Sequence, residues 1–436
     1  MEERNVIAPP LEDRALLDRL HRSTPPLRAA RPRSTALRVP RGSESGLETT
    51  LVIAAPLEDR FVMNGTPHTL VQIPAGVQCF VGPEARRRRA IEEAVLSVFE
   101  GWDYEEIIPP LFDYADVFAG PALGPKTYSF LGRDGSLLAL RPDFTSLLAK
   151  IAAGRLRDRP APIRLYYSGE VLRYEPPKAG RQSELYQMGL EQLGGVGPAA
   201  DAEVLAVAAE CLECLGITGW VLALGHVGVF SGLLAGSGLD PAGHEELRER
   251  VESKDEGGVL EACRRRGLPA SAAAALARLT TFGGDPSILA DAERAFAGSE
   301  RALVAVRELR AVAAALVEAG LGAHVSVDLG EVRGLDYYTG MVFRAYAPGL
   351  GFEVGGGGRY DGLLARFGRP MPAVGFMLGL DRVALLLERQ GALVESPAAD
   401  TESVSAEPLA AALASARAKR AGGSRIRFTA NHGARG

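Results

Sequence analysis

The chain has 436 residues, of which 47% are hydrophobic and 24% are charged, and its formal net charge at pH 7 is −5. No stretch comes near the roughly 20 consecutive apolar residues of a membrane-spanning helix, and the Arg-rich N-terminus lacks the apolar core of a secretory signal. These features exclude a membrane-spanning protein and a surface that is basic all over for nucleic acid. We therefore expect a cytoplasmic globular protein.

The composition changes along the chain and predicts a domain order. Residues 1–62 are dense in Pro, Arg and Ser, which predicts a disordered extension. Residues 63–224 and 323–390 mix strand and helix patterns and form two parts of one core. Residues 225–322 between them are rich in Ala, Leu and Glu with Gly/Pro breaks, which predicts a mostly helical insertion. Residues 391–436 are Ala/Ser-rich, lack an alternating strand–helix–strand pattern and are predicted to be a disordered tail.

The core begins with an amphipathic helix and a strand-to-helix transition. RRRRAIEEAVLSVFEG (86–101) has helical apolar spacing, and a strand is expected to lead from it into the prolines at 109–110. SLLALRPDFTSLLAKIAA (136–153) predicts a strand that runs into a helix. The residues expected to face the core from the first helix are Ile91, Val95, Val98 and Phe99.

Two long strands and a helix follow. APIRLYYSGEVLRYE (161–175) and LYQMGLEQLGG (185–195) flank a Pro/Gly loop, which predicts an antiparallel hairpin. The next helix, at 198–217, contains Cys211 and Cys214 in a C-x-x-C. No second pair completes four zinc ligands, so we expect buried helix residues and no metal.

Strand patterns resume after the helical stretch. AHVSVDLGEVRGLDYYTGMVFRAYA (323–347) alternates apolar and polar residues like a pair of sheet strands. GGGGRYDGLLARFG (355–368) predicts a Gly-rich turn with a short helix. AVGFMLGLDRVALLLERQ (373–390) predicts a strand and then a helix.

Polar and Gly residues are concentrated in four segments of this otherwise apolar core. The segments are 140–145 (LRPDFT), 171–191, 331–340 (EVRGLDYYTG) and 375–382 (GFMLGLDR). Because buried ionisable groups are costly unless they are paired or bind something, the four segments predict a ligand pocket on one sheet.

The residue types in these segments suit the charged ends of an amino acid. An ammonium group needs a carboxylate and neutral acceptors, and Asp143, Thr145 and Gln187 are of the right types. A carboxylate is gripped by a guanidinium in a two-pronged contact, which Arg333 or Arg173 could supply. Each residue alone is weak evidence, because a single Arg on a strand is usually a surface or salt-bridge residue.

An imidazole side chain would also find partners. Its ring nitrogens need an acceptor and a donor, and Glu191 and the Tyr338 hydroxyl are of the right types. Gly355–Gly358 would let the backbone approach such a ligand without a Cβ in the way. The set as a whole predicts a site for an amino acid such as histidine.

The same segments resemble the class II histidyl-tRNA synthetases over about residues 72–390. VLRYEPP…GR…YQMGLEQLG resembles their motif 2, GFMLGLDR their motif 3 and VRGLDYYTGMVF their histidine-binding strand. LRPDFT resembles their LRPEGT, with Asp143 and Phe144 in place of Glu and Gly. The resemblance implies an α+β fold, with a six-stranded antiparallel sheet flanked by helices, and a homodimer. It also implies a histidine pocket that carries over to Asp143, Thr145, Arg173, Gln187, Glu191, Arg333, Tyr337 and Tyr338.

Three departures separate the chain from a synthetase. The tail is shorter than the anticodon-binding domain of that family. In the motif 2 loop Ser183 replaces a cation and the carboxylate of Glu184 stands beside it; a carboxylate at about 4 Å would repel each charge of a polyphosphate by about 4 kcal/mol at an effective ε of about 20. The segment Tyr346–Gly349 is similar to another branch of the fold, the regulatory subunits of ATP phosphoribosyltransferase, the first enzyme of histidine biosynthesis.

Resemblance to that branch implies a non-catalytic regulatory subunit that mediates feedback inhibition by L-histidine. The implied partner is a short-form catalytic subunit in a hetero-octamer. Neither a cofactor, a metal, a membrane nor tRNA is expected. Retention of Arg173, Arg333 and Arg382, which serve adenylate chemistry in synthetases, keeps open a truncated or paralogous synthetase-like enzyme that activates histidine with ATP. A plain tRNA-binding module is a third reading.

Overall fold

The chain divides into two compact units, residues 1–67 and 68–436. In the first unit, β1 (Val62–Met63) pairs antiparallel with β2 (Thr66–Pro67). The structure is a computed structural model, and it describes residues 62–63, 66–67, 72–120, 123–174, 182–332, 337–392, 401–405 and 408–429.

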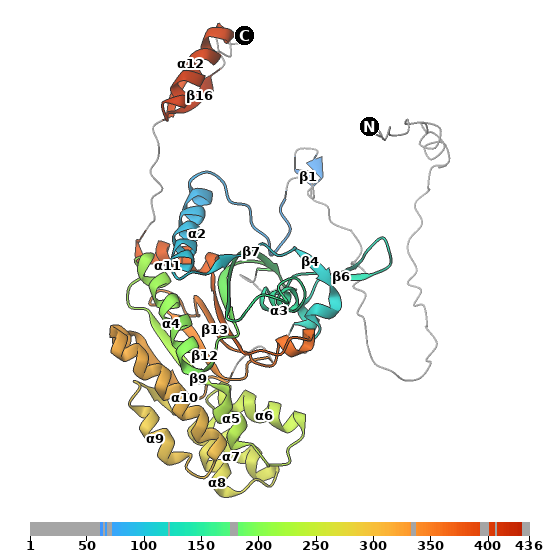
Figure 1. Ribbon diagram of the computed structural model, residues 1–436, viewed down its shortest axis with the longest axis vertical. Coiled ribbons are helices and arrows are strands. Elements are labelled where there is room, and N and C mark those ends of the chain that lie inside the picture. Colours follow the sequence, from blue (N-terminus) through green and yellow to red (C-terminus); the bar gives the residue numbers. More distant parts are fainter. Residues whose placement is uncertain are drawn as a thin grey trace. The chain divides into compact units, whose positions relative to one another are not determined.

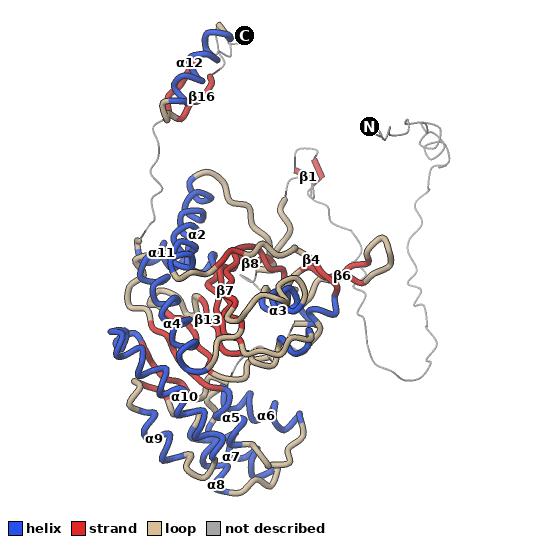
Figure 2. The backbone as a smooth tube through the Cα atoms, in the orientation of Figure 1, coloured by secondary structure: helices blue, strands red, loops and turns tan. Residues whose placement is uncertain are grey.

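A nine-stranded mixed sheet forms the centre of the second unit (Figures 1 and 2). Its strands, in spatial order, are β10 (Gly283–Gly284), β11 (Val325–Asp328), β9 (Val221–His226), β12 (Met341–Tyr346), β13 (Gly355–Arg359), β14 (Ala373–Gly379), β8 (Glu184–Leu193), β7 (Ile163–Leu172) and β3 (Glu105–Glu106). All neighbours from β9 to β7 are antiparallel, which confirms the predicted six-stranded antiparallel sheet and the β7–β8 hairpin. The structure adds parallel pairing of β11 with β9 and of β3 with β7 near the two edges.

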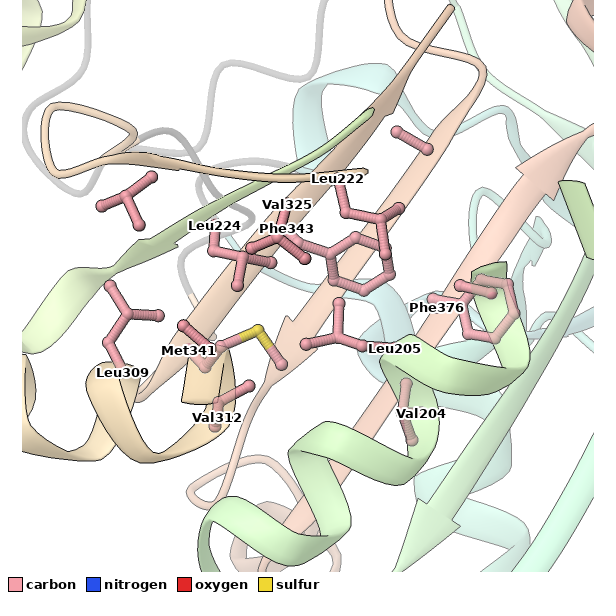
Figure 3. Packing of buried hydrophobic residues seen from close by; sticks show 14 of the residues in the cluster. Val204, Leu205, Leu222, Leu224, Leu309, Val312, Val325, Met341, Phe343 and Phe376 are labelled. Carbon is pink, nitrogen blue, oxygen red and sulfur yellow. The ribbon is translucent and has the colours of Figure 1, made fainter. Parts of the chain in front are cut away.

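Helices cover one face of this sheet. The covering helices are α2 (Pro83–Gly101), α4 (Gly197–Cys214), α10 (Glu300–Leu316) and α11 (Leu380–Gln390). Figure 3 shows Val204 and Leu205 of α4 and Leu309 and Val312 of α10 packed against apolar side chains from the strands. The residues that the sequence places on the core side of α2 are all buried, so the 3.6-residue spacing predicted this packing correctly.

A small three-stranded sheet lies beside α3 (Thr145–Ala153). Its strand order is β4 (Phe112–Tyr114), β6 (Leu137–Leu140) and β5 (Ser129–Leu131), all antiparallel. Ala139 and Leu147 are buried together between this sheet and α3, and Asp113 accepts a hydrogen bond from Lys150 at 2.5 Å. The strand-to-helix transition predicted at 136–153 is therefore confirmed as β6 followed by α3.

Helices dominate the stretch between β9 and β11. Side-chain oxygens of Asp240, Asp255 and Ser299 accept hydrogen bonds from the first turns of three of these helices, which fixes where they begin. The shorter helices of the stretch are α5 (Val227–Leu233), α6 (Pro241–Glu252), α7 (Glu256–Arg265), α8 (Ala270–Arg278) and α9 (Ile288–Ala295). The stretch ends in the short turns η4 (Val317–Leu321) and η5 (Gly322–His324), and similar short turns elsewhere are η2 (Ala115–Phe118), η3 (Gly124–Lys126) and η6 (Leu364–Phe367). No helix in the described ranges is long and apolar enough to cross a bilayer.

The Gly-rich segment after β12 is a strand and not the predicted turn. Gly355–Arg359 form β13, which is hydrogen-bonded to β12 on one side and β14 on the other. A Cβ on Gly357 would clash with the carbonyl oxygen of Gly375, so the neighbouring strand approaches too closely for a side chain. Glycines suggest turns when they are read alone, but here they allow close strand packing in the middle of a sheet.

The predicted disordered tail contains regular structure in its described part. β15 (Thr401–Ser405), α12 (Leu409–Ala421) and β16 (Arg425–Thr429) form a strand–helix–strand unit with parallel strands. Val404, Ala412 and Ala416 are buried. The prediction failed because the two strands are short and carry few apolar residues: β15 (TESVS) has only Val404, and β16 (RIRFT) has only Ile426 and Phe428.

Candidate functional site

A cavity of about 610 Å³ opens on the face of the sheet opposite the covering helices. This volume lies within the range of ligand pockets, roughly 300–1,000 Å³. The structure brings seven of the eight predicted site residues to its wall, and Arg333 lies outside the described residues. The seven are Asp143, Thr145, Arg173, Gln187, Glu191, Tyr337 and Tyr338.

Strand alternation explains why these side chains converge. On β8, Gln187 and Glu191 are four residues apart and point into the cavity, while Tyr186 points toward α2 and donates a hydrogen bond to Glu92. Gly375 and Met377 of β14 line the same cavity. Residues from all four polar segments therefore line this one cavity, although not every residue of each segment does.

Alternation also overturns one part of the sequence argument. Glu184 lies seven residues from Glu191 and therefore points to the opposite face of β8. It lines a separate hollow of about 230 Å³ beside Arg88 and Arg89 of α2. Repulsion of a polyphosphate in the main cavity by Glu184 was therefore a wrong inference.

The closed end of the cavity is built around Glu191, whose side chain is almost fully buried. The Thr145 hydroxyl donates to its Oε1 at 2.7 Å, and the Tyr360 hydroxyl donates to its Oε2. Burial raises the pKa of Glu191 from 4.5 to about 8, and the two hydroxyl donors offset part of that rise. Tyr360 is the residue that the sequence argument missed. Its signal was a tyrosine directly after the glycines and Arg359.

Asp143 lies beside this cluster at the start of α3. Its carboxylate accepts from the Ser146 hydroxyl at 3.1 Å and from the Ser146 amide at 3.4 Å. Burial raises the pKa of Asp143, and the nearby Arg173 guanidinium counters that shift. Arg173 donates from Nε to the Pro142 carbonyl at 2.7 Å. A carboxylate and a guanidinium are therefore both present at this wall.

Aromatic rings complete the closed end. Phe144 stacks on Tyr167 with ring centroids 4.0 Å apart and planes inclined by 15°. Tyr337 contacts Tyr338 and Tyr360 edge-on, with centroids 5.1 and 5.7 Å apart. A buried carboxylate among aromatic walls suits a flat ring that carries N–H groups.

Glycines form the floor between these walls. Gly355, Gly356, Gly357 and Gly375 line the cavity, and a Cβ on Gly375 would clash with Glu191 Oε2. A Cβ on Gly356 would lie 2.6 Å from the Phe343 carbonyl oxygen. The absence of side chains lets a ligand rest on the sheet backbone and lets Glu191 lie across its neighbouring strand.

The other end of the cavity holds a chain of ion pairs. Arg344 contacts Glu331 at 3.0 Å and Glu353 at 3.5 Å, and Glu353 also accepts from Arg382 at 2.7 Å. The motif 3 arginine, Arg382, therefore already has a carboxylate partner. The ion pair of Arg382 with Glu353 is the physical argument against a bound polyphosphate, because the positive charge of Arg382 is already neutralised by a carboxylate of the protein.

Metal chemistry has no support in the described residues, where no three His, Cys, Asp or Glu side chains are grouped to hold an ion. Cys211 is buried in α4 as predicted, whereas Cys214 is exposed, contrary to the prediction for the pair. Partial desolvation of its sulfur, together with the nearby Glu210 carboxylate, raises the pKa of the Cys214 thiol to about 11, so it is protonated at neutral pH.

Comparison with known proteins agrees with this architecture. The family model for histidyl-tRNA synthetase matches residues 76–383. The ATP phosphoribosyltransferase regulatory subunit of Moorella thermoacetica is 41% identical over 82% of this chain and 91% of its own length. That of Symbiobacterium thermophilum is 40% identical over 77% and 84%. A solved structure from Bacillus halodurans C, described as an ATP phosphoribosyltransferase regulatory subunit/histidyl-tRNA synthetase, is 28% identical with a TM-score of 0.74 over 84% and 94%. The chain therefore belongs to the family of ATP phosphoribosyltransferase regulatory subunits, which share the histidyl-tRNA synthetase fold.

Proposed function

We propose that this chain is the regulatory subunit through which histidine inhibits an ATP phosphoribosyltransferase. The chain matches most of the length of relatives that are named as regulatory subunits of ATP phosphoribosyltransferase. The observation that carries the effector assignment is the closed end of the cavity, where Glu191 is held by Thr145 and Tyr360 among aromatic rings.

The pocket offers a complementary group for each part of histidine. Glu191 faces the imidazole and shares a proton with it, since the two groups titrate in the same pH range. Asp143 and Gln187 accept from the ammonium group, and Arg173 binds the carboxylate. Arg333, the alternative to Arg173 for this contact, lies outside the described residues.

The catalytic partner is a short-form phosphoribosyltransferase chain, and the proposed assembly is a hetero-octamer. The name of the relatives supports a catalytic partner. The stoichiometry and the cytoplasmic location stay predictions from the sequence.

Within that assembly the chain is proposed to form a homodimer through the outer face of the small sheet. We define the docking face as Phe112, Phe130, Leu138 and Leu140, which alternation places on the side turned away from α3. Phe112 is 49% exposed and lies edge-on to Phe130, with ring centroids 5.8 Å apart. The face is uncharged, and such exposed apolar patches mark protein contacts. An uncharged apolar face can meet its own copy across a two-fold axis.

Two measurements test the proposal. Titration calorimetry of the full chain with L-histidine is expected to show saturable binding, and no binding by the chain or its complex would remove the effector role. Mixing the chain with a short catalytic subunit is expected to give phosphoribosyl-ATP formation that histidine suppresses. Formation at the same rate without the chain would contradict the regulatory role.

The rival function is activation of histidine by ATP, for which the retained Arg173 and Arg382 are the favourable observation. Against it, Arg382 is paired with Glu353 at 2.7 Å. The purified chain is therefore expected to show no histidine-dependent ATP–pyrophosphate exchange. A tRNA-binding function would instead appear as retention of tRNA on filters with a steep salt dependence.

A further inference from the structure

Arg141 is a buried arginine between the small sheet and the cavity that the proposed function does not use. Its guanidinium donates to three carbonyl oxygens, those of Glu170 at 2.6 Å, Pro109 at 3.0 Å and Pro110 at 3.4 Å. The nearest carboxylate, Glu170, lies 3.8 Å away. Burial lowers the pKa of Arg141, because a buried guanidinium charge costs free energy. The three carbonyl acceptors offset part of that cost.

On one side Arg141 grips the segment that leads into the docking face. Its side chain holds the carbonyls of Pro109 and Pro110, and its own amide donates to the Leu111 carbonyl at 2.9 Å. Phe112 of the docking face is the next residue, and Ile108 on the other side of the prolines is 86% exposed. A partner that covers Phe112 therefore contacts the chain shortly after Pro109 and Pro110, whose carbonyl oxygens accept hydrogen bonds from Arg141.

On the other side Arg141 touches the wall of the cavity. Its guanidinium lies over the Phe144 ring, 4.2 Å from the centroid, and Phe144 stacks on Tyr167. Both rings line the cavity, and the Tyr167 hydroxyl oxygen would lie 2.5 Å from a Cβ on Gly189 of β8. Movement of the guanidinium would therefore shift a ring that lies against the effector.

We infer that Arg141 is a positioning residue that couples the docking face to the effector cavity, so that histidine binding and association with a second copy of this chain change each other's affinity. The inference rests on the proposed histidine site and homodimer. Its physical basis is one rigid group that contacts both regions, because the planar guanidinium binds carbonyls through its edge and an aromatic ring through its face. Coupling between two binding events is reciprocal, so either affinity reports it.

The experiment measures the dimer dissociation constant of the full chain, by mass photometry over a dilution series, without histidine and at saturating histidine. For the unaltered protein the two constants are expected to differ by about 5-fold to 150-fold. Arg141→Lys keeps the charge but loses the planar guanidinium. In this variant the ratio of the two dimer dissociation constants, without and with histidine, is expected to fall to about one, while both histidine binding and dimerisation persist.

Arg369→Lys is the matched control. Arg369 also donates to three carbonyl oxygens, those of Ala152, Leu156 and Arg159, and it lines neither the cavity nor the docking face. Its variant should lose a similar amount of stability and keep the unaltered ratio. A merely structural role for Arg141 would leave the two variants alike.

The outcomes separate this inference from the proposals beneath it. Absence of histidine binding, or of a dimer, in the unaltered protein contradicts the proposed function, whereas binding and dimerisation with a ratio of one contradict only the coupling. An unchanged ratio in Arg141→Lys also overturns it. If that variant does not fold, Phe144→Leu removes the ring between Arg141 and Tyr167 and must abolish the ratio for the inference to stand.

Discussion

The Tyr360 hydroxyl donates a hydrogen bond to Glu191 Oε2, although the two residues are 169 positions apart. Together with Thr145 on the other oxygen, it holds the carboxylate across Gly375 in the floor of the cavity. The carboxyl is therefore positioned before any ligand arrives, and its protonation is set by burial. Preorganisation of this kind improves affinity because no side chain has to be ordered on binding.

Glu191→Gln is expected to weaken histidine binding by about 10-fold to 150-fold, because hydrogen bonds to charged groups contribute about 1.5–3 kcal/mol. The isosteric amide should leave the fold intact. Calorimetric titration measures the affinity, and Glu100→Gln is the control, since Glu100 also accepts from a tyrosine hydroxyl, that of Tyr166, outside the cavity. Equal affinity in both variants would show that Glu191 is not the imidazole partner.

Histidine affinity is expected to peak between about pH 6.5 and about 8. In that window the imidazole of free histidine is neutral and Glu191 of the free protein is protonated. The two groups together then hold one proton, which is the number that the bound pair shares, so binding neither takes up nor releases a proton. Above pH 8 a proton must be taken up, and below about 6.5 one must be released, each at about tenfold loss of affinity per pH unit. Affinity that kept rising to pH 9 would show that the bound pair holds no proton.

The stability of the ligand-free protein is expected to fall as the pH rises from about 5 to 8. The pKa of Glu191 is raised from 4.5 to about 8, so over this range the folded state retains a proton that the unfolded chain has lost. The slope from one such proton reaches about 1.4 kcal/mol per pH unit. Chemical denaturation at several pH values should show a flatter slope in Glu191→Gln than in the unaltered protein, and the same slope in both would argue against the raised pKa.

Gly375→Ala is expected to weaken histidine binding about as much as Glu191→Gln does. The added methyl group would occupy the space of Glu191 Oε2 and clash with the Leu190 carbonyl oxygen, so the carboxylate must leave its two hydroxyl donors and the backbone of β8 must shift as well. Calorimetry measures the affinity. Gly101→Ala, where a Cβ would meet nothing within 4 Å, is the control. Normal affinity in Gly375→Ala would mean that Glu191 binds from another position.

Phe112→Glu is expected to raise the dimer dissociation constant by more than about 100-fold, because it places an unpaired charge in an apolar contact. Sedimentation velocity measures the change. Leu260→Glu on α7 is the control, because Leu260 is similarly exposed and lies outside the docking face. A Phe112→Glu chain that remains dimeric would place the dimer contact elsewhere.

Local patterns in the sequence were sufficient for much of the fold and of the site. The hairpin of β7 and β8 and the buried face of α2 follow from period-2 and period-3.6 spacing. Asp143, Gln187 and Glu191 were found because polar residues stand out in buried strands. These features depend on neighbours that are close in the chain or on the chemistry of single residues.

The failures have two causes. Glu184 was assigned to the cavity because the motif 2 loop of the resembled family binds phosphates there, but alternation along β8 turns its side chain to the opposite face. The other two failures come from contacts between distant segments. Tyr360 becomes part of the site only through the antiparallel pairing of β13 with β14 and of β14 with β8, which brings it over Glu191. Ion pairing of Arg382 with Glu353 was likewise invisible, because a sequence does not show which cations are already neutralised.

The four glycines of β13 also bear on the order in which the sheet folds. Gly355–Gly358 lose more backbone entropy on ordering than other residues, and they bury no side chain in return. We therefore expect β13 to order late, after β12 and β14 have formed the channel that receives it, with φ-values near zero. Until then Tyr360 is not in reach of Glu191, so a nascent or partly unfolded subunit would not respond to the effector.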